Sequence, residues 1–307
     1  MPEKTDTRGL IAWFNICIVW GTTYLAIRIG VEHIPPMLFA GIRWIIAGTG
    51  FILYLRLSGK SFPAVKELIP VAIPGILMLG LGNGLVVVAE QWIPSGLAAL
   101  LITTLPFWIV GIESIIPSGV KLNKIILSGL ILGLIGVFLI FSDDFKYLFI
   151  KENLIGVLSL MAAVFFWSLG TIYSKYKKIS VHPLMGASVQ MLAAGILQTI
   201  VGLSLGEASQ FYFERNSMLA LIYLILIGSI IGYGSYIYAI KKLPLSLVST
   251  YAYINPVIAL FLGWLILDER LTIQIIIAAF VIIAGVFVVK KGASVSGTPK
   301  INTQPVR

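Results

Sequence analysis

Three ionisable residues interrupt long apolar stretches of the sequence: Arg43, Glu90 and Glu113. An unpaired charge in such surroundings costs at least about 2.5 kcal/mol, so each needs water, a partner or a ligand. Arg43 can anchor an anion or a carboxylate, pair with Glu90, or extend to the lipid headgroups. Glu113 is the deepest acidic residue, and a carboxyl group removed from water takes up a proton more readily. It can exchange protons, as can Glu90, or it can be a solvated rim residue paired with Lys121 or Lys124.

Aromatic and small polar residues recur at helical spacing. Trp20, Thr23 and Tyr24 stand at i, i+3 and i+4, and Trp167 with Thr171 repeats part of this pattern. Phenol and amide groups are costly when they face lipid, so a shared cavity is expected, with the interfacial aromatic belt as the alternative. Aromatic walls with a few polar groups suit an amphipathic solute. The candidate binding residues are Trp20, Thr23, Tyr24, Arg43, Asn83, Trp108, Trp167, Thr171, Tyr233, Tyr236, Tyr253 and Asn255.

The elements that must position these residues are predicted to be membrane helices. Of 307 residues, 58% are apolar and 11% charged, against roughly a quarter charged in soluble domains. This composition excludes an ordinary soluble enzyme and predicts an all-α integral membrane protein with ten transmembrane helices. The expected spans lie near residues 11–30, 37–57, 68–89, 96–116, 124–142, 154–174, 184–205, 218–240, 246–267 and 271–290.

The distribution of charge predicts the orientation. Lys and Arg are enriched in the cytoplasmic connections of membrane proteins. With the N-terminus inside, most of the 22 Lys and Arg residues fall on the inner side, and most acidic residues on the outer side. Both termini are therefore expected in the cytoplasm. The net charge of +9 reflects this topology and indicates no nucleic-acid partner, because the basic residues lie in short pieces between apolar runs.

The two halves of the sequence match each other in order. Trp20 meets Trp167 at an offset of 147, and Pro106 meets Pro256 at 150. Because five helices per half is an odd number, the second half must enter from the opposite face, which gives two inverted five-helix repeats. The two prolines bend their helices, so they either gate a cavity or are packing bends. The expected organisation is a first repeat over 1–150, a second over 151–292 and a polar cytoplasmic tail over 293–307.

Several other chemistries are excluded by what the sequence offers. Cys17 is the single cysteine, and His33 and His182 are the two histidines, so no structural metal or disulfide frame is expected. The segment Gly59-Lys60-Ser61 resembles part of a phosphate loop, but Tyr54 stands where its first glycine belongs. Without an ATP site, transport energy must come from a gradient, and no cofactor or enzymatic activity is expected.

Several short motifs follow one another along the chain. They are Trp20-Gly21-Thr22-Thr23-Tyr24, Pro36 with Arg43, Gly82-Asn83-Gly84 through Ala89-Glu90-Gln91, Ser95 to Leu100, Pro106-Phe107-Trp108, and Asn255-Pro256 followed by Leu267 to Thr272. Together these motifs resemble the EamA family of the drug/metabolite transporter superfamily, over about residues 8–291. This resemblance implies a bacterial inner (plasma) membrane carrier, most often an exporter of amino acids or related small metabolites.

The sequence therefore predicts an alternating-access secondary transporter with a small-molecule substrate, the lipid bilayer as its surroundings and protons as candidate coupling ions. A monomer is favoured and a homodimer stays open. The alternatives are drug or cation efflux, a sugar-type carrier and a channel. Cation efflux is disfavoured because the small multidrug pumps of the superfamily use a carboxylate in their first helix, and the first span here has none.

Overall fold

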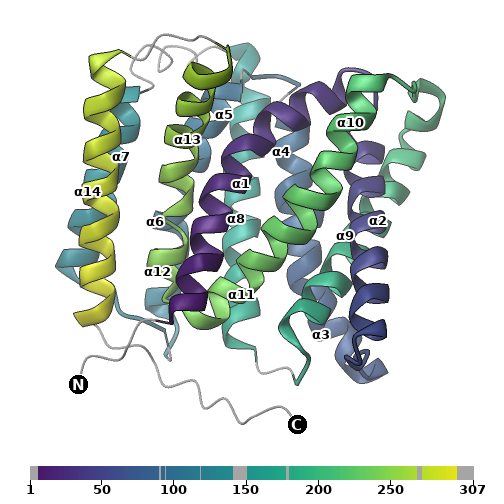
Figure 1. Cartoon of the computed structure of the whole chain (residues 1–307), viewed down its shortest axis with the longest axis horizontal. Coiled ribbons are helices and arrows are strands. Elements are labelled where there is room, and N and C mark those ends of the chain that lie inside the picture. The colour runs from purple at the N-terminus through teal and green to yellow at the C-terminus, as the bar shows by residue number, and fades with distance from the viewer. Residues whose placement is uncertain are drawn as a thin grey trace.

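The computed structural model describes residues 6–89, 91–93, 95–117, 119–140, 151–177, 180–267 and 272–295. All secondary structure in these ranges is helical (Figure 1). In chain order the elements are α1 (Thr7–Val31), α2 (Pro36–Leu57), α3 (Val65–Gly75), η1 (Ile76–Asn83), α4 (Gly84–Ala89), α5 (Ser95–Ile102), α6 (Leu105–Ile115), α7 (Lys124–Ile140), η3 (Lys151–Asn153), α8 (Leu154–Tyr176), α9 (Pro183–Ser204), η4 (Glu207–Gln210), α10 (Arg215–Tyr223), η5 (Leu224–Tyr233), α11 (Gly234–Lys242), α12 (Leu245–Val248), α13 (Tyr251–Leu267) and α14 (Ile273–Val295).

Seven helices of the described chain are long and apolar enough to cross a membrane. Two of them, the third and eighth predicted spans, join several elements end to end. The seven are Thr7–Val31, Pro36–Leu57, Val65–Ala89, Leu154–Tyr176, Pro183–Ser204, Arg215–Lys242 and Ile273–Val295. Three shorter apolar helices, Leu100–Ile115, Lys124–Ile140 and Leu245–Ile258, occupy the other predicted segments. An all-helical membrane protein is thus confirmed, whereas ten full spans stay a prediction.

Equivalent helices of the two halves cross as antiparallel pairs. A Cβ added at Gly48 of α2 would meet the main-chain nitrogen of Leu192 at 2.8 Å, and one at Gly195 of α9 would meet that of Ile45 at 2.7 Å. The contact partner on α9 moves backward as α2 advances, so the helices run in opposite directions. The two contacts are equivalent in the two halves, because an offset of 147 relates Gly48 to Gly195 and Ile45 to Leu192. An inverted repeat requires this arrangement, because its two-fold axis passes between equivalent helices.

The fifth and tenth predicted spans form a second such pair, α7 with α14, at the left of Figure 1. A Cβ at Gly129 would meet the nitrogen of Val289 at 2.7 Å, and a Cβ at Gly136 would meet Ile282 at the same distance. These partners again run backward along α14. Small residues at such crossings let helix backbones approach closely in a membrane.

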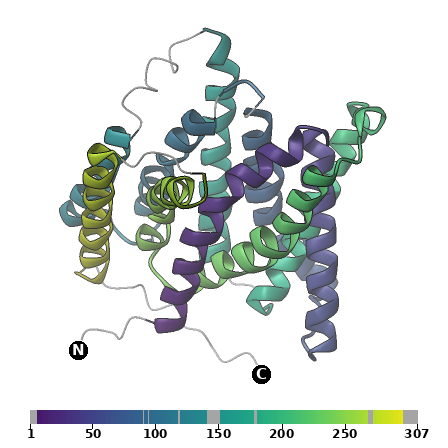
Figure 2. The ribbon, with the colours of Figure 1, turned by 45° about the horizontal axis from the view of Figure 1, so that its top comes forward.

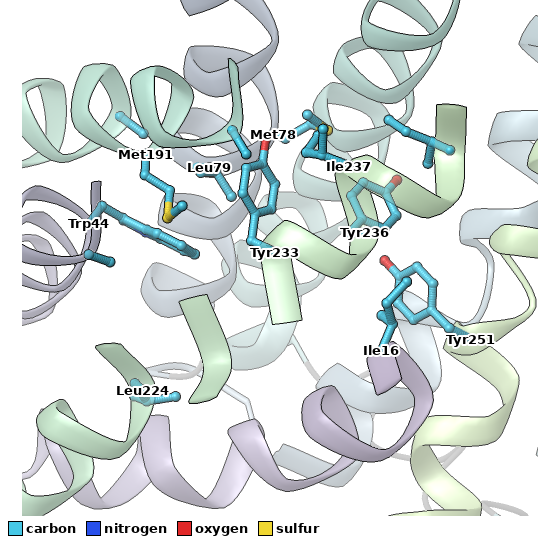
Figure 3. Packing of buried hydrophobic residues seen from close by; sticks show 14 of the residues in the cluster. Ile16, Trp44, Met78, Leu79, Met191, Leu224, Tyr233, Tyr236, Ile237 and Tyr251 are labelled. Carbon is cyan, nitrogen blue, oxygen red and sulfur yellow. The ribbon is translucent and has the colours of Figure 1, made fainter. Parts of the chain in front are cut away.

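The first helix of each half is embedded in the other half. α1 packs against α13 and along α10, η5 and α11, while α8 packs against α5 and α6 and along α3, η1 and α4. Figure 2 shows α1 lying across the α10–α11 segment. Each half therefore packs its first helix against helices of the other half. The large core cluster includes the buried rings of Tyr233 and Tyr236 (Figure 3).

Four of the predicted spans depart from regular α-helix, and they do so in matched pairs. The third and eighth each contain a π-helix, η1 and η5, which widens the turn and is frequent at functional sites. The fourth breaks between α5 and α6 at Thr103 and Thr104, and the ninth between α12 and α13 at Ser249 and Thr250. All four hydroxyl groups donate to the carbonyl three residues earlier. Side-chain donors of this kind allow irregular backbone inside a bundle.

Candidate functional site

A cavity lies between the two halves. Its walls come from α1, α2, α8 and α13, and from the η1–α4 and α5–α6 segments. The space in it that is open to water-sized molecules is about 90 Å³. The lining residues are Trp20, Thr23, Ile27, Arg43, Trp44, Gly82, Asn83, Val86, Ile102, Leu105, Ala163, Val164, Trp167, Tyr251 and Asn255.

Arg43 is the charged residue of this lining, and only 4% of it is exposed. Its Nε donates to Oγ of Ser229 at 2.8 Å, and its guanidinium carbon lies 4.2 Å from the ring centroid of Trp44. Both partners are neutral, and the described residues place no carboxylate beside it in an ion pair. The predicted alternative partner, Glu90, lies outside the described residues. A buried guanidinium with neutral neighbours keeps most of its N–H donors for an anion.

Two amides flank this cation in the cavity. Trp44 donates from its indole nitrogen to Oδ1 of Asn83 at 3.3 Å. Asn255, in the amide orientation that satisfies its surroundings, donates from Nδ2 to the main-chain oxygens of Cys17 and Tyr251, at 3.0 Å each. The two amides are therefore held differently, one through its oxygen and the other through its nitrogen.

Aromatic rings form another part of the cavity wall. The Trp20 ring lies edge-on to Trp167 and Tyr251, with centroids 5.5 and 5.0 Å apart. The Trp20 indole nitrogen donates to the carbonyl oxygen of Gly228 in η5, at 3.2 Å. Behind the wall, Trp167 donates to the hydroxyl of Tyr236 at 3.0 Å. The rings are thus fixed by hydrogen bonds to their own framework and present apolar faces and edges to the cavity.

The structure brings six of the predicted binding residues together on the cavity: Trp20, Thr23, Arg43, Asn83, Trp167 and Asn255. The side chain of Tyr24 lies outside the described part of the chain. The remaining five lie elsewhere in the packed interior, so the geometry lends no direct support to a binding role for Trp108, Thr171, Tyr233, Tyr236 and Tyr253.

Those five residues have structural partners of their own. Tyr233 donates to Gln190 at 2.6 Å, and Tyr253 donates to the carbonyl oxygen of Leu130 at 3.1 Å. The hydroxyls of Thr171 and Tyr236 lie 2.5 Å apart, and Trp108 packs edge-on against Phe165. Figure 3 shows Tyr233 and Tyr236 among buried side chains. A phenol that finds an internal acceptor can be buried without facing a cavity, which residue type alone does not reveal.

Glu113, the main coupling candidate, lies apart from the cavity lining near the end of α6, with 1% exposed. Tyr176, at the end of α8, donates to Oε1 of Glu113 at 2.5 Å. Next to it, Lys175 donates to the carbonyl oxygen of Leu243 at 2.5 Å and attracts the Glu113 carboxylate electrostatically. We refer to Glu113, Lys175, Tyr176 and Leu243 as the end cluster. It joins the first half to the second.

The surroundings of Glu113 differ from those of a solvated rim residue. Lys121, an expected partner, donates instead to the main-chain oxygens of Ser114 and Ile116, at 2.8 and 3.3 Å.

The two gating candidates lie at different places in their helices. Pro106 is the second residue of α6, just after the break in the fourth predicted span, whereas Pro256 lies inside α13, six residues after the break in the ninth. The two halves therefore place these prolines differently relative to their breaks.

Some cavity residues were missed by sequence reasoning. Trp44 directly follows Arg43, one of the predicted binding residues. The helical spacing that indicated the other aromatic candidates did not single it out. Tyr251 stands near the start of the ninth span, where aromatic residues are usually interfacial. Lys175, which belongs to the end cluster and not to the cavity, was also missed, because it stands near the end of a span, where its stem would ordinarily reach the interface.

An all-helical membrane bundle with antiparallel equivalent helices and a cavity between its halves is the architecture of secondary transporters. The family comparison agrees with this class. The model of the EamA-like transporter family matches residues 7–142 and again 154–290, so each half of the chain is one match. The chain belongs to this family.

Related proteins carry transporter names. The chain is 36% identical to the inner membrane transporter YedA of Escherichia coli strain K12, over 82% of this chain and 80% of that protein. It is 27% identical to the transporter YoaV of Bacillus subtilis strain 168, over 91% and 95% of the two chains. It is 25% identical to a probable amino-acid metabolite efflux pump of Escherichia coli strain K12, over 94% and 95%.

A crystal structure supports the fold independently. It superposes on this chain with a TM-score of 0.78 at 22% identity, covering 93% of this chain and 97% of the other. The arrangement of helices is therefore one that a solved protein adopts. The family match and the relatives' names together place the protein among membrane transporters.

Proposed function

We propose that the protein is an alternating-access secondary transporter that exports small metabolites, with amino acids favoured, across the inner membrane. One observation carries the proposal: Arg43 stands in the wall of an aromatic cavity between the repeats and has only neutral described partners. Such a site favours a solute that brings its own negative group. The name of one relative, a probable amino-acid metabolite efflux pump, supports the same class of substrate.

The proposed topology has ten spans and cytoplasmic termini. The end cluster lies at the same end of the bundle as the start of α1, because Lys242 at the end of α11 lies 3.8 Å from Asp6, the N-cap of α1. α14 ends at this edge too (Figure 1). With the termini inside, the end cluster lies at the cytoplasmic end of the bundle, where we propose that it closes the path from the cavity to the cytoplasm.

Inward opening must separate the end cluster, since the Tyr176–Glu113 hydrogen bond joins the two halves. A proton on Glu113 would remove its attraction to Lys175 and weaken its role as acceptor, which links proton uptake to opening. Glu113 is therefore the proposed coupling residue, with Glu90 as the second candidate. Pro106 begins the helix that carries Glu113 and is the proposed hinge, with Pro256 as its counterpart in the other half.

The positive cavity weighs against cation efflux, because a cationic solute would meet Arg43 without a described carboxylate to offset it. A sugar-type carrier is the second candidate, since amides and indole rings also suit sugar hydroxyls and ring faces.

Transport by purified protein in lipid vesicles tests the proposal. Labelled amino acids, a sugar and a cationic dye are offered with and without a pH gradient. Saturable movement of amino acids, driven uphill by the gradient, is expected. Saturable movement of the dye alone would contradict the proposed substrate class.

A further inference from the structure

The polar side chains that line the cavity differ in what their hydrogen bonds leave over: Arg43 and Asn83 offer donors, and Asn255 offers an acceptor. We propose that the cavity binds a zwitterionic α-amino acid with an apolar side chain in one fixed orientation, its carboxylate at Arg43 and Asn83 and its ammonium group at Asn255. This inference rests on the proposed function and names the substrate and how the cavity holds it.

The donor end is built by Trp44. Its ring supports the Arg43 guanidinium from one side at 4.2 Å, and its N–H occupies Oδ1 of Asn83. Ser229 accepts from Nε of Arg43, which leaves the terminal guanidinium nitrogens for a ligand. With its oxygen occupied, Asn83 offers its NH₂ group. A planar guanidinium together with an amide donor matches the two oxygens of a carboxylate. Trp44 is thus a positioning residue.

The acceptor end is Asn255. Both hydrogens of its Nδ2 are used by the carbonyl oxygens of Cys17 and Tyr251. An amide has two donor hydrogens, so the group of this residue that remains for a ligand is Oδ1, an acceptor. An ammonium group brings only donors and suits this oxygen. The adjacent Trp20 and Tyr251 rings also attract a cation through their π-faces.

Apart from Thr23, whose hydroxyl donates to the carbonyl oxygen of Trp20, the rest of the lining is largely apolar and selects the side chain. Trp20, Trp167 and Tyr251 form the aromatic wall, and Ile27, Val86, Ile102 and Leu105 complete the apolar surface. A charged or strongly polar side chain would lose its hydration there without gaining a described ion-pair partner. An amino acid with an aromatic or branched aliphatic side chain fits both the polar ends and the apolar walls.

Three probes that differ only at the polar ends test this orientation on purified protein: L-phenylalanine, L-phenylalaninamide, which lacks the carboxylate, and 3-phenylpropionate, which lacks the ammonium group. Wild-type protein should bind L-phenylalanine at least about tenfold more tightly than either analogue. Arg43→Gln should weaken L-phenylalanine and 3-phenylpropionate by at least about tenfold and leave L-phenylalaninamide nearly unchanged. Asn255→Leu should weaken L-phenylalanine and L-phenylalaninamide and spare 3-phenylpropionate.

Gln190→Leu is the matched control, because Gln190 occupies the position equivalent to Arg43 in the second half but does not line the cavity. It should leave the ratios among the probes unchanged. If Arg43→Gln fails to fold, Arg43→Lys keeps the charge without the planar fork and should still discriminate against L-phenylalaninamide, though less strongly. If the Arg43 variants weakened the binding of all three probes equally, the proposed orientation would be overturned. That result would not contradict the proposed transport of amino acids. Transport of the cationic dye with no binding of any probe would overturn the proposed function itself.

Discussion

Replacing Gly48 with alanine should destabilise the crossing of α2 and α9, on which the two-fold relation of the repeats depends. The added Cβ would lie 2.8 Å from both the nitrogen of Leu192 and the oxygen of Ser188. These are main-chain atoms of a helix, so neither can rotate away. Gly50, two residues further along α2, is the matched control, because no described atom lies within 4 Å of a Cβ built there.

The magnitude follows from the contact distances. Ordinary van der Waals contact begins at 3.4 Å, so α2 and α9 must separate by roughly 0.6 Å to admit the methyl group at Gly48. Overpacking of this kind costs roughly 1–3 kcal/mol. The intrinsic helix preference for alanine over glycine is the same in both variants and cancels in the comparison. Gly48→Ala should therefore be roughly 1–3 kcal/mol less stable than Gly50→Ala.

The assay is reversible unfolding in mixed detergent micelles, read as the free energy of unfolding. Gly195→Ala serves as a symmetry test, because its Cβ would meet the nitrogen of Ile45 at 2.7 Å. It should lose about as much stability as Gly48→Ala. Equal stability of Gly48→Ala and Gly50→Ala would refute the antiparallel crossing of equivalent helices at this point.

Two further predictions concern the end of the bundle that is proposed to face the cytoplasm. Tyr176→Phe removes the hydrogen bond to Glu113, so the inner end should open more often than in Tyr173→Phe, a control one turn earlier on α8. The readout is the rate at which a maleimide labels Ser249→Cys, introduced into a chain with no other cysteine and assayed in inside-out vesicles. Labelling should be several-fold faster with Tyr176→Phe than with Tyr173→Phe. Equal labelling rates in these two variants would argue against a closure at the end cluster. A fluorescent protein fused after Arg307 should fluoresce in the cytoplasm, whereas periplasmic phosphatase activity at the same point would reverse the proposed topology.

Much of the helical architecture could be predicted from the sequence, because lipid demands long apolar segments with satisfied backbones. The predicted span at 37–57 corresponds to Pro36–Leu57, and the one at 154–174 to Leu154–Tyr176. The π-helices η1 and η5 could not be predicted. They replace regular hydrogen bonding in runs as apolar as their neighbours, and hydropathy does not register such a change. Gln198 donates to the carbonyl oxygens of Leu79 and Gly80 in η1, a contact between distant segments that spacing cannot show.

The candidate site was predictable where a residue is costly in lipid and has few ways to be satisfied. Arg43 and Asn255 are of this kind, and both lie on the cavity. Tyr233 and Tyr253 are amphipathic, and a single internal acceptor satisfies each, so their burial away from the cavity depends on tertiary contacts. Trp44 shows the converse: its importance comes from holding both Arg43 and Asn83, which only the folded chain reveals.

Counterflow in lipid vesicles tests the central claim most directly, that the cavity between the repeats carries a carboxylate-bearing solute past Arg43. Vesicles with purified protein are loaded with unlabelled L-phenylalanine and diluted into a trace of the labelled compound. Wild-type protein should accumulate label transiently, and Arg43→Gln should abolish the transient while remaining folded. Equal transients in wild-type and Arg43→Gln protein, or no transient in either while a cationic dye is exchanged, would contradict the account.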